Sequence, residues 1–188
     1  MDTAETLEGH ATEIRHTPQD HLQETREKLI ADTFTAYADG SSLGNPGPGG
    51  WAVIITGSGE RRVVIGSAKV ASNNQMELTA ATNALTSLPL DAVGVIHCDS
   101  EYVVKGLNDW LPGWKRRGWY TSKGKPVANA EYWRTLEALA KQRPGVRFAW
   151  VRGHAGNPEN ELVDTLARAE AEKVRAGLPA VSRLELSE

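Results

Sequence analysis

The chain has 188 residues, of which 40% are hydrophobic and 24% are charged, a composition typical of one globular domain with a substantial core. Its single cysteine, Cys98, excludes an internal disulfide bond, and no apolar stretch reaches the length that a membrane-spanning helix needs. The net charge of −3 excludes the strongly basic composition that marks many nucleic-acid-binding proteins.

The charge is unevenly distributed along the chain. Residues 1–32 carry eight acidic and three basic side chains, a net charge of −5, which leaves +2 for the rest of the chain. We expect this acidic extension to be disordered or loosely docked, with the binding of a protein partner as the alternative. Because the N-terminus lacks an apolar signal segment and is too acidic for a transit peptide, we expect a cytoplasmic protein.

Three strand-like runs come first, at residues 34–39, 51–56 and 62–67. The Gly-Ser-Gly-Glu segment between the second and third runs predicts a hairpin. The glycine- and proline-rich residues 39–50 are typical of a hairpin turn, or of backbone that comes close to a bulky ligand. Residues 75–88 place apolar side chains on one helical face, which predicts a helix.

A continuous apolar run at residues 93–98 predicts a buried central strand, and residues 100–109 predict a short helix. Another predicted helix begins at Asn129, and residues 146–151 form a fifth predicted strand. The last predicted helix covers residues 157–177. This order of elements predicts an α/β fold in which a mixed sheet is flanked by helices.

Four acidic residues stand in separate segments where elements begin or end: Asp39, Glu77, Asp99 and Asp164. Asp39 and Asp99 end apolar strand runs, and ligands of open α/β sheets bind at the C-terminal ends of strands. Convergent carboxylates repel one another unless a hard cation lies between them, and oxygen ligands suit Mg²⁺ or Mn²⁺. The pattern predicts a metal-dependent enzyme that acts on phosphate esters. Taken alone, Glu77 is also typical of a surface charge near a helix N-terminus.

Three other features suit nucleic-acid chemistry, each with a plainer alternative. Asn73 or Asn74 is expected to cap a helix, and asparagine amides also bind 2′-hydroxyls and base edges. Residues 110–127 interleave tryptophans with five basic residues and no acidic one, as in a phosphate-binding segment or in a basic loop anchored by core tryptophans. His154, in a glycine-flanked loop, can shuttle a proton or help a product leave, or can be an ordinary surface histidine.

Together these motifs resemble type 1 ribonuclease H, the bacterial-type enzyme that cuts the RNA strand of RNA–DNA hybrids. The resemblance covers about residues 33–176 and rests on five segments in matching order and spacing, namely YADGSSLGNPGPGGW, SNNQMELTAA, CDSEYV, WLPGWKRRGW with KPV, and VRGHAGNPENELVD. It implies a catalytic domain with the ribonuclease H fold, whose five-stranded mixed sheet has three antiparallel strands first. Residues 177–188 lie outside the match and are expected to form a flexible tail.

The resemblance implies a catalytic role for Asp39, Glu77, Asp99, Asp164 and His154. The four carboxylates match the family's metal ligands for two Mg²⁺ ions, with Mn²⁺ as a substitute, and the histidine matches one that assists product release. We expect hydrolysis of the RNA strand that leaves 5′-phosphate and 3′-hydroxyl ends. The alternatives are a catalytically silent hybrid-binding module and a DNA-directed nuclease of the same superfamily. We expect a monomer, because no sequence feature indicates an oligomer.

The resemblance also implies a set of residues that contact the hybrid. Residues 110–127 match the family's basic protrusion, which grips the DNA strand, and other positions hold a DNA phosphate or read the minor groove and the RNA 2′-hydroxyls. Glu101 departs from the family, in which a neutral glutamine is common at this position. The implied substrate-binding residues are Asn45, Ser72, Asn73, Asn74, Glu101, Trp110, Trp114, Lys115, Arg116, Arg117 and Trp119.

Overall fold

The computed structural model describes residues 19, 22–23, 33–57 and 59–187. The expected acidic extension, residues 1–32, falls almost entirely outside the described residues, so its expected disorder and protein partner stay predictions. Among the described helices, none combines the length and the hydrophobicity that crossing a bilayer requires.

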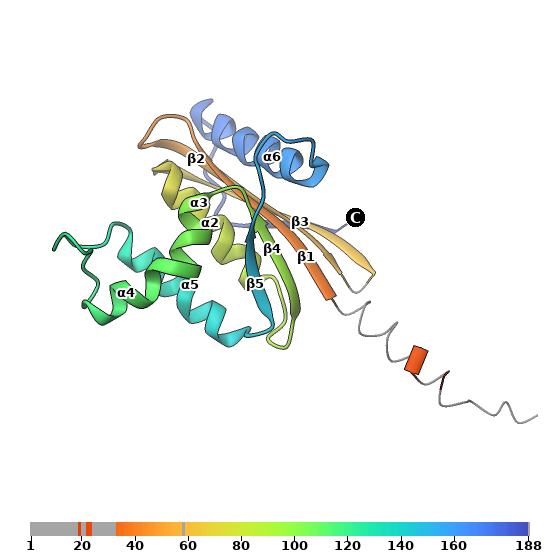
Figure 1. The fold of residues 1–188 in the computed structure, drawn as a ribbon. Coiled ribbons are helices and arrows are strands. Elements are labelled where there is room, and N and C mark those ends of the chain that lie inside the picture. Colours follow the sequence, from red (N-terminus) through yellow and green to blue (C-terminus); the bar gives the residue numbers. More distant parts are fainter. Residues whose placement is uncertain (1–18, 20–21, 24–32, 58, 188) are drawn as a thin grey trace, which may run out of the picture. The chain divides into compact units, whose positions relative to one another are not determined.

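A mixed sheet forms the centre of the described domain (Figure 1). The neighbouring strands β1, β2 and β3 are antiparallel, whereas β4 runs parallel to β1 and β5 runs parallel to β4. The predicted α/β fold, with three antiparallel strands first, is therefore confirmed. In the spatial order β5-β4-β1-β2-β3-β6, the strands are β5 (Val146–Trp150), β4 (Val93–Cys98), β1 (Thr33–Ser42), β2 (Gly47–Gly57), β3 (Glu60–Ala71) and β6 (Leu184–Ser187).

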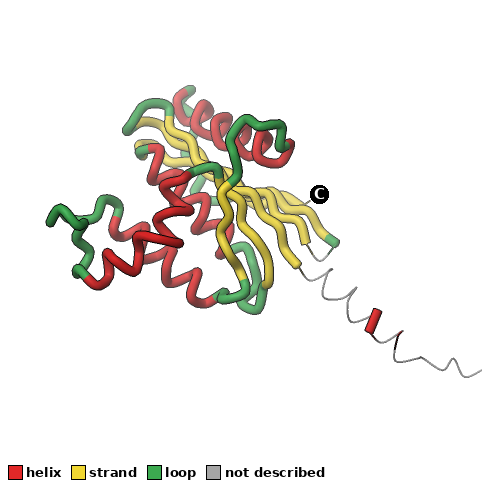
Figure 2. Tube along the Cα trace, in the orientation of Figure 1, coloured by secondary structure: helices red, strands yellow, loops and turns green. Residues whose placement is uncertain are grey.

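Helices cover both faces of this sheet (Figure 2). Helices α2 and α5 pack on one face, and α6 packs on the other face against β1, β2 and β3. The short helices α3, η1 and α4 follow one another between β4 and α5, where the sequence predicts one helix at 100–109. The helices are α2 (Asn73–Thr86), α3 (Glu101–Lys105), η1 (Gly106–Trp110), α4 (Leu111–Arg116), α5 (Ala130–Gln142) and α6 (Pro158–Arg175).

The alternation of side chains along β2 explains why helices pack on both faces of the sheet. Val53 lies in the hydrophobic cluster that includes Leu78 of α2, whereas the next residue, Ile54, lies in the cluster that includes Val163 of α6. Successive strand residues point to opposite faces, so an apolar run on a central strand must be buried on both sides. The sheet is thereby held between two helical layers, and its C-terminal strand ends stay free to form a site.

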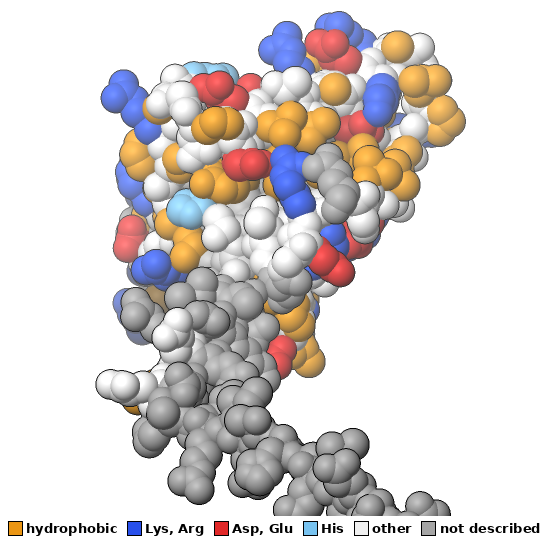
Figure 3. Space-filling model, turned by 90° about the vertical axis from the view of Figure 1, so that its right-hand side faces the viewer, with side chains coloured by type: hydrophobic (Ala, Val, Ile, Leu, Met, Phe, Trp, Pro, Cys, Tyr) orange, Lys and Arg blue, Asp and Glu red, His pale blue; other side chains and the backbone are white. Residues whose placement is uncertain are grey.

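The C-terminal segment differs from the expected flexible tail and adds a sixth strand to the expected five. Strand β6 pairs antiparallel with β3, and Arg62 of β3 donates to Glu185 of β6 through a 2.9 Å hydrogen bond between Nη1 and Oε1. The reason is tertiary, because β3 would otherwise present the unpaired edge of the sheet, and a short segment that can pair there is stabilised by it. Among the described residues on the side of the molecule that Figure 3 shows, basic and acidic side chains are interspersed among hydrophobic ones.

Candidate active site

Three of the four predicted carboxylates meet where β4 ends beside β1. Asp39 lies within β1, which continues to Ser42, and not at the end of the strand as predicted. The parallel register of these strands places Tyr37 opposite His97, so Asp39 and Asp99, two residues further along, also come close together. Helix α2 packs on β1 and brings Glu77 to the same place. One potential ligand atom of each carboxylate lies within 4.8 Å of those of the other two. Three carboxylates this close together offer the oxygen ligands that a divalent cation binds.

Burial and mutual repulsion act strongly on these carboxylates. Asp39 is 5% exposed and Glu77 is 8% exposed. Burial, followed by the charges of Asp99 and Asp164, raises the pKa of Asp39 from 3.8 to about 7. Burial and the charge of Asp39 raise the pKa of Glu77 well above its usual value of 4.5. Without a cation the cluster therefore retains protons near neutral pH, and a bound cation would displace them.

Asp164 stands close to this cluster without joining it as closely. It is half-buried on α6, and its charge contributes to the raised pKa of both Asp39 and Glu77. Among the described residues, the group with all ligand atoms within 4.8 Å nevertheless consists of Asp39, Glu77 and Asp99. The role of Asp164 as a fourth metal ligand therefore remains a prediction.

His154 lies exposed in the loop that connects β5 to α6. Its backbone is left-handed, with φ at 51°, a conformation that is uncommon for residues other than glycine. The loop reaches the carboxylates through Gly153, because a Cβ atom built on this glycine would lie 2.8 Å from Oδ2 of Asp99. The structure thus places the histidine next to residues at the site and outside the group of three carboxylates.

The start of α2 differs in one respect from the prediction. The capping residue is Ser72, whose hydroxyl accepts from the backbone N–H of Gln75 at 3.3 Å, so neither Asn73 nor Asn74 is the cap. Both asparagines are exposed on the first turn, and the backbone N–H of Asn73 donates to Oδ1 of Asn45 at 3.2 Å. A serine at this position completes a reciprocal capping box with Gln75, which explains the preference. The two side-chain amides are left available to a ligand.

Glu101 forms an exposed ion pair with Lys105 one helical turn later, at 2.5 Å between Oε2 and Nζ. The lysine offsets the negative charge at this position of α3. The departure from a neutral glutamine is therefore partly compensated within the chain itself.

The expected basic protrusion divides into buried and exposed parts. Trp114 is 9% exposed and packs against Trp133, so it is a core residue rather than a free stacking surface. Lys115 pairs with Glu137 at 2.6 Å, which occupies its charge. Trp119 is half-buried beneath the guanidinium of Arg134, which lies 4.7 Å from its ring centroid. Both readings of this segment thus apply, because tryptophans anchor it and part of its basic surface stays exposed.

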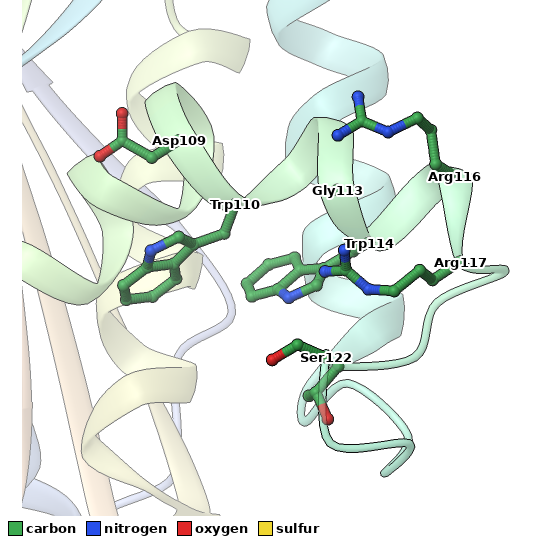
Figure 4. Close-up of a pocket in the computed structure, with 8 residues that line it drawn as sticks. Asp109, Trp110, Gly113, Trp114, Arg116, Arg117 and Ser122 are labelled. Carbon is green, nitrogen blue, oxygen red and sulfur yellow. The ribbon is translucent and has the colours of Figure 1, made fainter.

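The exposed part surrounds a hollow of about 440 Å³ on α4 and the loop that follows (Figure 4). Arg116 and Arg117 are both exposed at this hollow, and Trp110 is 37% exposed beside them. Asp109 places one carboxylate on the same rim. Two guanidinium groups beside an indole form a surface suited to a phosphate–sugar backbone.

Two residues that contact Asp99 were not predicted from the sequence. The side-chain amide of Asn160 on α6 donates to Oδ2 of Asp99 at 3.2 Å, and the indole N–H of Trp150 donates to its backbone carbonyl at 3.0 Å. One signal was present, because Asn160 precedes Asp164 by four residues and must share its face of α6. For Trp150 no such local signal exists, because β5 meets β4 only in the folded sheet.

Comparisons with known proteins agree with this geometry. Residues 31–172 match the RNase H family model. Ribonuclease H of Thiobacillus denitrificans is 48% identical over 139 residues, which are 74% of this chain and 93% of that protein. Ribonuclease H of Xanthomonas campestris pv. campestris is 49% identical over 146 residues, 78% of this chain and 97% of that protein.

Solved structures show the same fold. The crystal structure of LC9-RNase H1, a type 1 RNase H, superposes with a TM-score of 0.68 at 30% identity and covers 82% of this chain and 77% of that one. The structure of LC11-RNase H1 in complex with an RNA/DNA hybrid has a TM-score of 0.59 at 23% identity, covering 76% of this chain and 99% of that one. The second likeness concerns the fold alone.

Proposed function

Because this chain belongs to the ribonuclease H family, we infer that it is an endonuclease that hydrolyses the RNA strand of RNA–DNA hybrids. The observation that supports this function most directly is the cluster of Asp39, Glu77 and Asp99, with ligand atoms within 4.8 Å of one another. A protein that only bound nucleic acid would gain nothing from negative charges gathered where a phosphate must approach.

The donor chemistry of the cluster fits a divalent cation. All its ligand atoms are carboxylate oxygens, and burial together with the charges of the neighbouring carboxylates raises the pKa of Asp39 and of Glu77, so a cation bound here would relieve their repulsion. We propose that Asp39, Glu77, Asp99 and Asp164 hold two Mg²⁺ ions, with Mn²⁺ as a substitute. Bound in this way, such ions supply an activated water molecule and stabilise charge on the phosphate.

Other residues of the chain would orient the substrate. We propose that Arg116 and Arg117, which line the exposed hollow, bind phosphates of the DNA strand, and that the exposed amides of Asn73 and Asn74 bind 2′-hydroxyls and minor-groove base edges. His154, exposed in its loop, can deliver a proton to the departing 3′-oxygen and help the product leave. The products would carry 5′-phosphate and 3′-hydroxyl ends. The cytoplasmic location and the monomeric state stay predictions from the sequence.

A cleavage panel tests this function. The protein is incubated with an RNA–DNA hybrid, double-stranded DNA and double-stranded RNA of one sequence, in Mg²⁺, in Mn²⁺ and in EDTA. We expect internal cleavage of the RNA strand of the hybrid alone, stopped by EDTA, with end-labelled products that map to 5′-phosphates. Cleavage of double-stranded DNA would indicate a DNA-directed nuclease, and hybrid binding without cleavage would indicate a silent binding module.

Replacing both exposed arginines at the hollow should weaken substrate binding without slowing the chemical step. For the double variant Arg116→Ala/Arg117→Ala we expect KM for the hybrid to rise about tenfold and kcat to change less than about twofold, because phosphate contacts outside the carboxylate cluster act on binding. The slope of log affinity against log salt concentration should fall by about two, one for each lost phosphate contact.

A matched control removes the same charge from another surface. Arg168 and Arg175 on α6 are exposed and pair only with Glu172 among the described ion pairs. The double variant Arg168→Ala/Arg175→Ala should leave KM and the salt slope close to those of the unmodified protein. Equal effects of the two double variants would show that net charge, rather than the hollow, determines binding.

A further inference from the structure

Asn160, on α6, makes a side-chain hydrogen bond to Asp99. Its side-chain Nδ2 donates to Oδ2 of Asp99 at 3.2 Å. The direction of this bond follows from chemistry, because an ionised carboxylate can only accept, so the amide must present its NH₂ group to it. The backbone N–H of Asn160 is bound in turn by Oδ1 of Asn157, the cap of α6. The cap and the carboxylate together determine the orientation of this side chain.

The oxygen of the same amide has no hydrogen-bond partner among the described residues. Asn160 is 2% exposed, and its buried Oδ1 accepts no hydrogen bond from any described residue. A buried polar atom left without a partner has a cost in stability, so its presence in a folded protein calls for an explanation. Leucine has nearly the same shape and would avoid this cost, which indicates that the amide serves a purpose other than packing.

We propose that Asn160 is a positioning residue for the metal site: it orients the carboxylate of Asp99 for a divalent ion, and its Oδ1 accepts a hydrogen bond from a water molecule that arrives with the ion. This inference rests on the proposed function and deepens it. An amide suits the task because it donates to Asp99 without adding another negative charge to Asp39, Glu77 and Asp99. Hydrogen-bond partners of metal ligands commonly tune metal affinity in this way.

Direct measurement of Mn²⁺ binding to the full chain, by calorimetry or by electron paramagnetic resonance, tests the inference. For Asn160→Ala we expect the dissociation constant for Mn²⁺ to rise by about 10- to 100-fold. Asn83→Ala is the matched control. The side-chain amide of Asn83 also donates a hydrogen bond, to the backbone carbonyl of Thr79 at 2.9 Å, but Asn83 lies near the C-terminal end of α2, whereas Glu77 lies near its N-terminal end. The control should bind Mn²⁺ as the unmodified protein does.

A second variant separates positioning from stability. Asn160→Leu keeps the branch point and the number of heavy atoms of the side chain and removes the unpaired Oδ1, so in EDTA its Tm should equal or exceed that of the unmodified protein while its Mn²⁺ affinity falls. Unchanged Mn²⁺ affinity in both Asn160 variants would overturn the inference and leave the proposed function standing. Loss of the folded circular-dichroism spectrum in both would also overturn it, because Asn160 would then act through folding. If the unmodified protein bound no Mn²⁺, the proposed metal site itself would be wrong.

Discussion

Asp39→Asn is expected to lose nearly all cleavage of RNA–DNA hybrids, by about 1000-fold or more, and still to bind the hybrid. The ligand atoms of Asp39 lie within 4.8 Å of those of both Glu77 and Asp99, so its loss removes a charge that a bound cation needs. A metal ion commonly contributes several kcal/mol to a transition state of this kind, and about 4 kcal/mol corresponds to a factor of 1000 in rate. Hybrid affinity should persist, because Arg116 and Arg117, the arginines that we propose to bind phosphates, do not belong to the carboxylate cluster.

The same variant should be more stable than the unmodified protein when metal is absent. Burial and neighbouring charges raise the pKa of folded Asp39 to about 7, from 3.8. The folded state therefore binds the proton more tightly than the unfolded state, so the stabilising contribution of this group is fully present below pH 3.8 and is lost as the pH rises through about 7. The rise in the pKa of Asp39 from 3.8 to about 7 corresponds to about 4 kcal/mol, which is the upper bound on the stability that Asp39→Asn gains at about pH 8.

Thermal unfolding in EDTA between pH 5 and pH 8 measures this difference, with rates of hybrid cleavage recorded alongside. The Tm of Asp39→Asn should exceed that of the unmodified protein at about pH 8, and the gap should narrow toward about pH 5. When Mg²⁺ replaces EDTA, the Tm of the unmodified protein should rise, whereas the Tm of Asp39→Asn should not. Asp91→Asn, at an exposed position before β4, is the control and should leave cleavage unchanged. Substantial Mg²⁺-dependent cleavage by Asp39→Asn would refute the assignment.

Gly40→Ala is expected to destabilise the protein by about 3 kcal/mol or more and to reduce kcat by about 100-fold. A Cβ atom at Gly40 would lie 2.1 Å from the backbone carbonyl carbon of Met76 and 2.2 Å from the backbone nitrogen of Glu77. Neither backbone atom can yield without moving α2 away from β1. The move would separate Asp39 from Glu77, so stability and catalysis should fall together.

Urea unfolding and steady-state kinetics check this prediction, with Gly113→Ala as the matched control. The nearest atoms to a Cβ atom at Gly113 belong to the flexible end of the Arg117 side chain, at 3.0 Å, and Gly113 lies within helix α4. Alanine should therefore leave kcat unchanged and the free energy of unfolding within about 1 kcal/mol of that of the unmodified protein. KM is left out of this control, because Gly113 and Arg117 line the hollow that we propose to bind the hybrid. A stable and fully active Gly40→Ala variant would show that the backbone contact between β1 and α2 is not what brings the two carboxylates together.

Local sequence patterns carried much of this structure. The first five strands, and the helices that begin near residues 75, 129 and 157, lie where hydrophobic period and capping residues predict them. Such patterns involve residues that are close together in the chain, so they can be recognised from the sequence alone. The approach of Asp39 to Asp99 could be anticipated for a related reason, since the sequence places both near the C-terminal ends of strands that lie side by side, although β1 continues past Asp39 to Ser42.

Features that depend on tertiary packing could not be predicted from such local patterns. The pairing of β6 with the edge of β3, the burial of Trp114 and the pairing of Lys115 with Glu137 each join segments that are distant in sequence. The same holds for the amide of Asn160 on Asp99 and for the raised pKa of Asp39. The sequence alone thus determined where the first five strands and the longer helices form and which acidic residues lie near their ends, because those are local matters of period and capping. Only the tertiary structure decided how deeply each charge is buried and what it touches, because burial and contact are properties of the assembled layers.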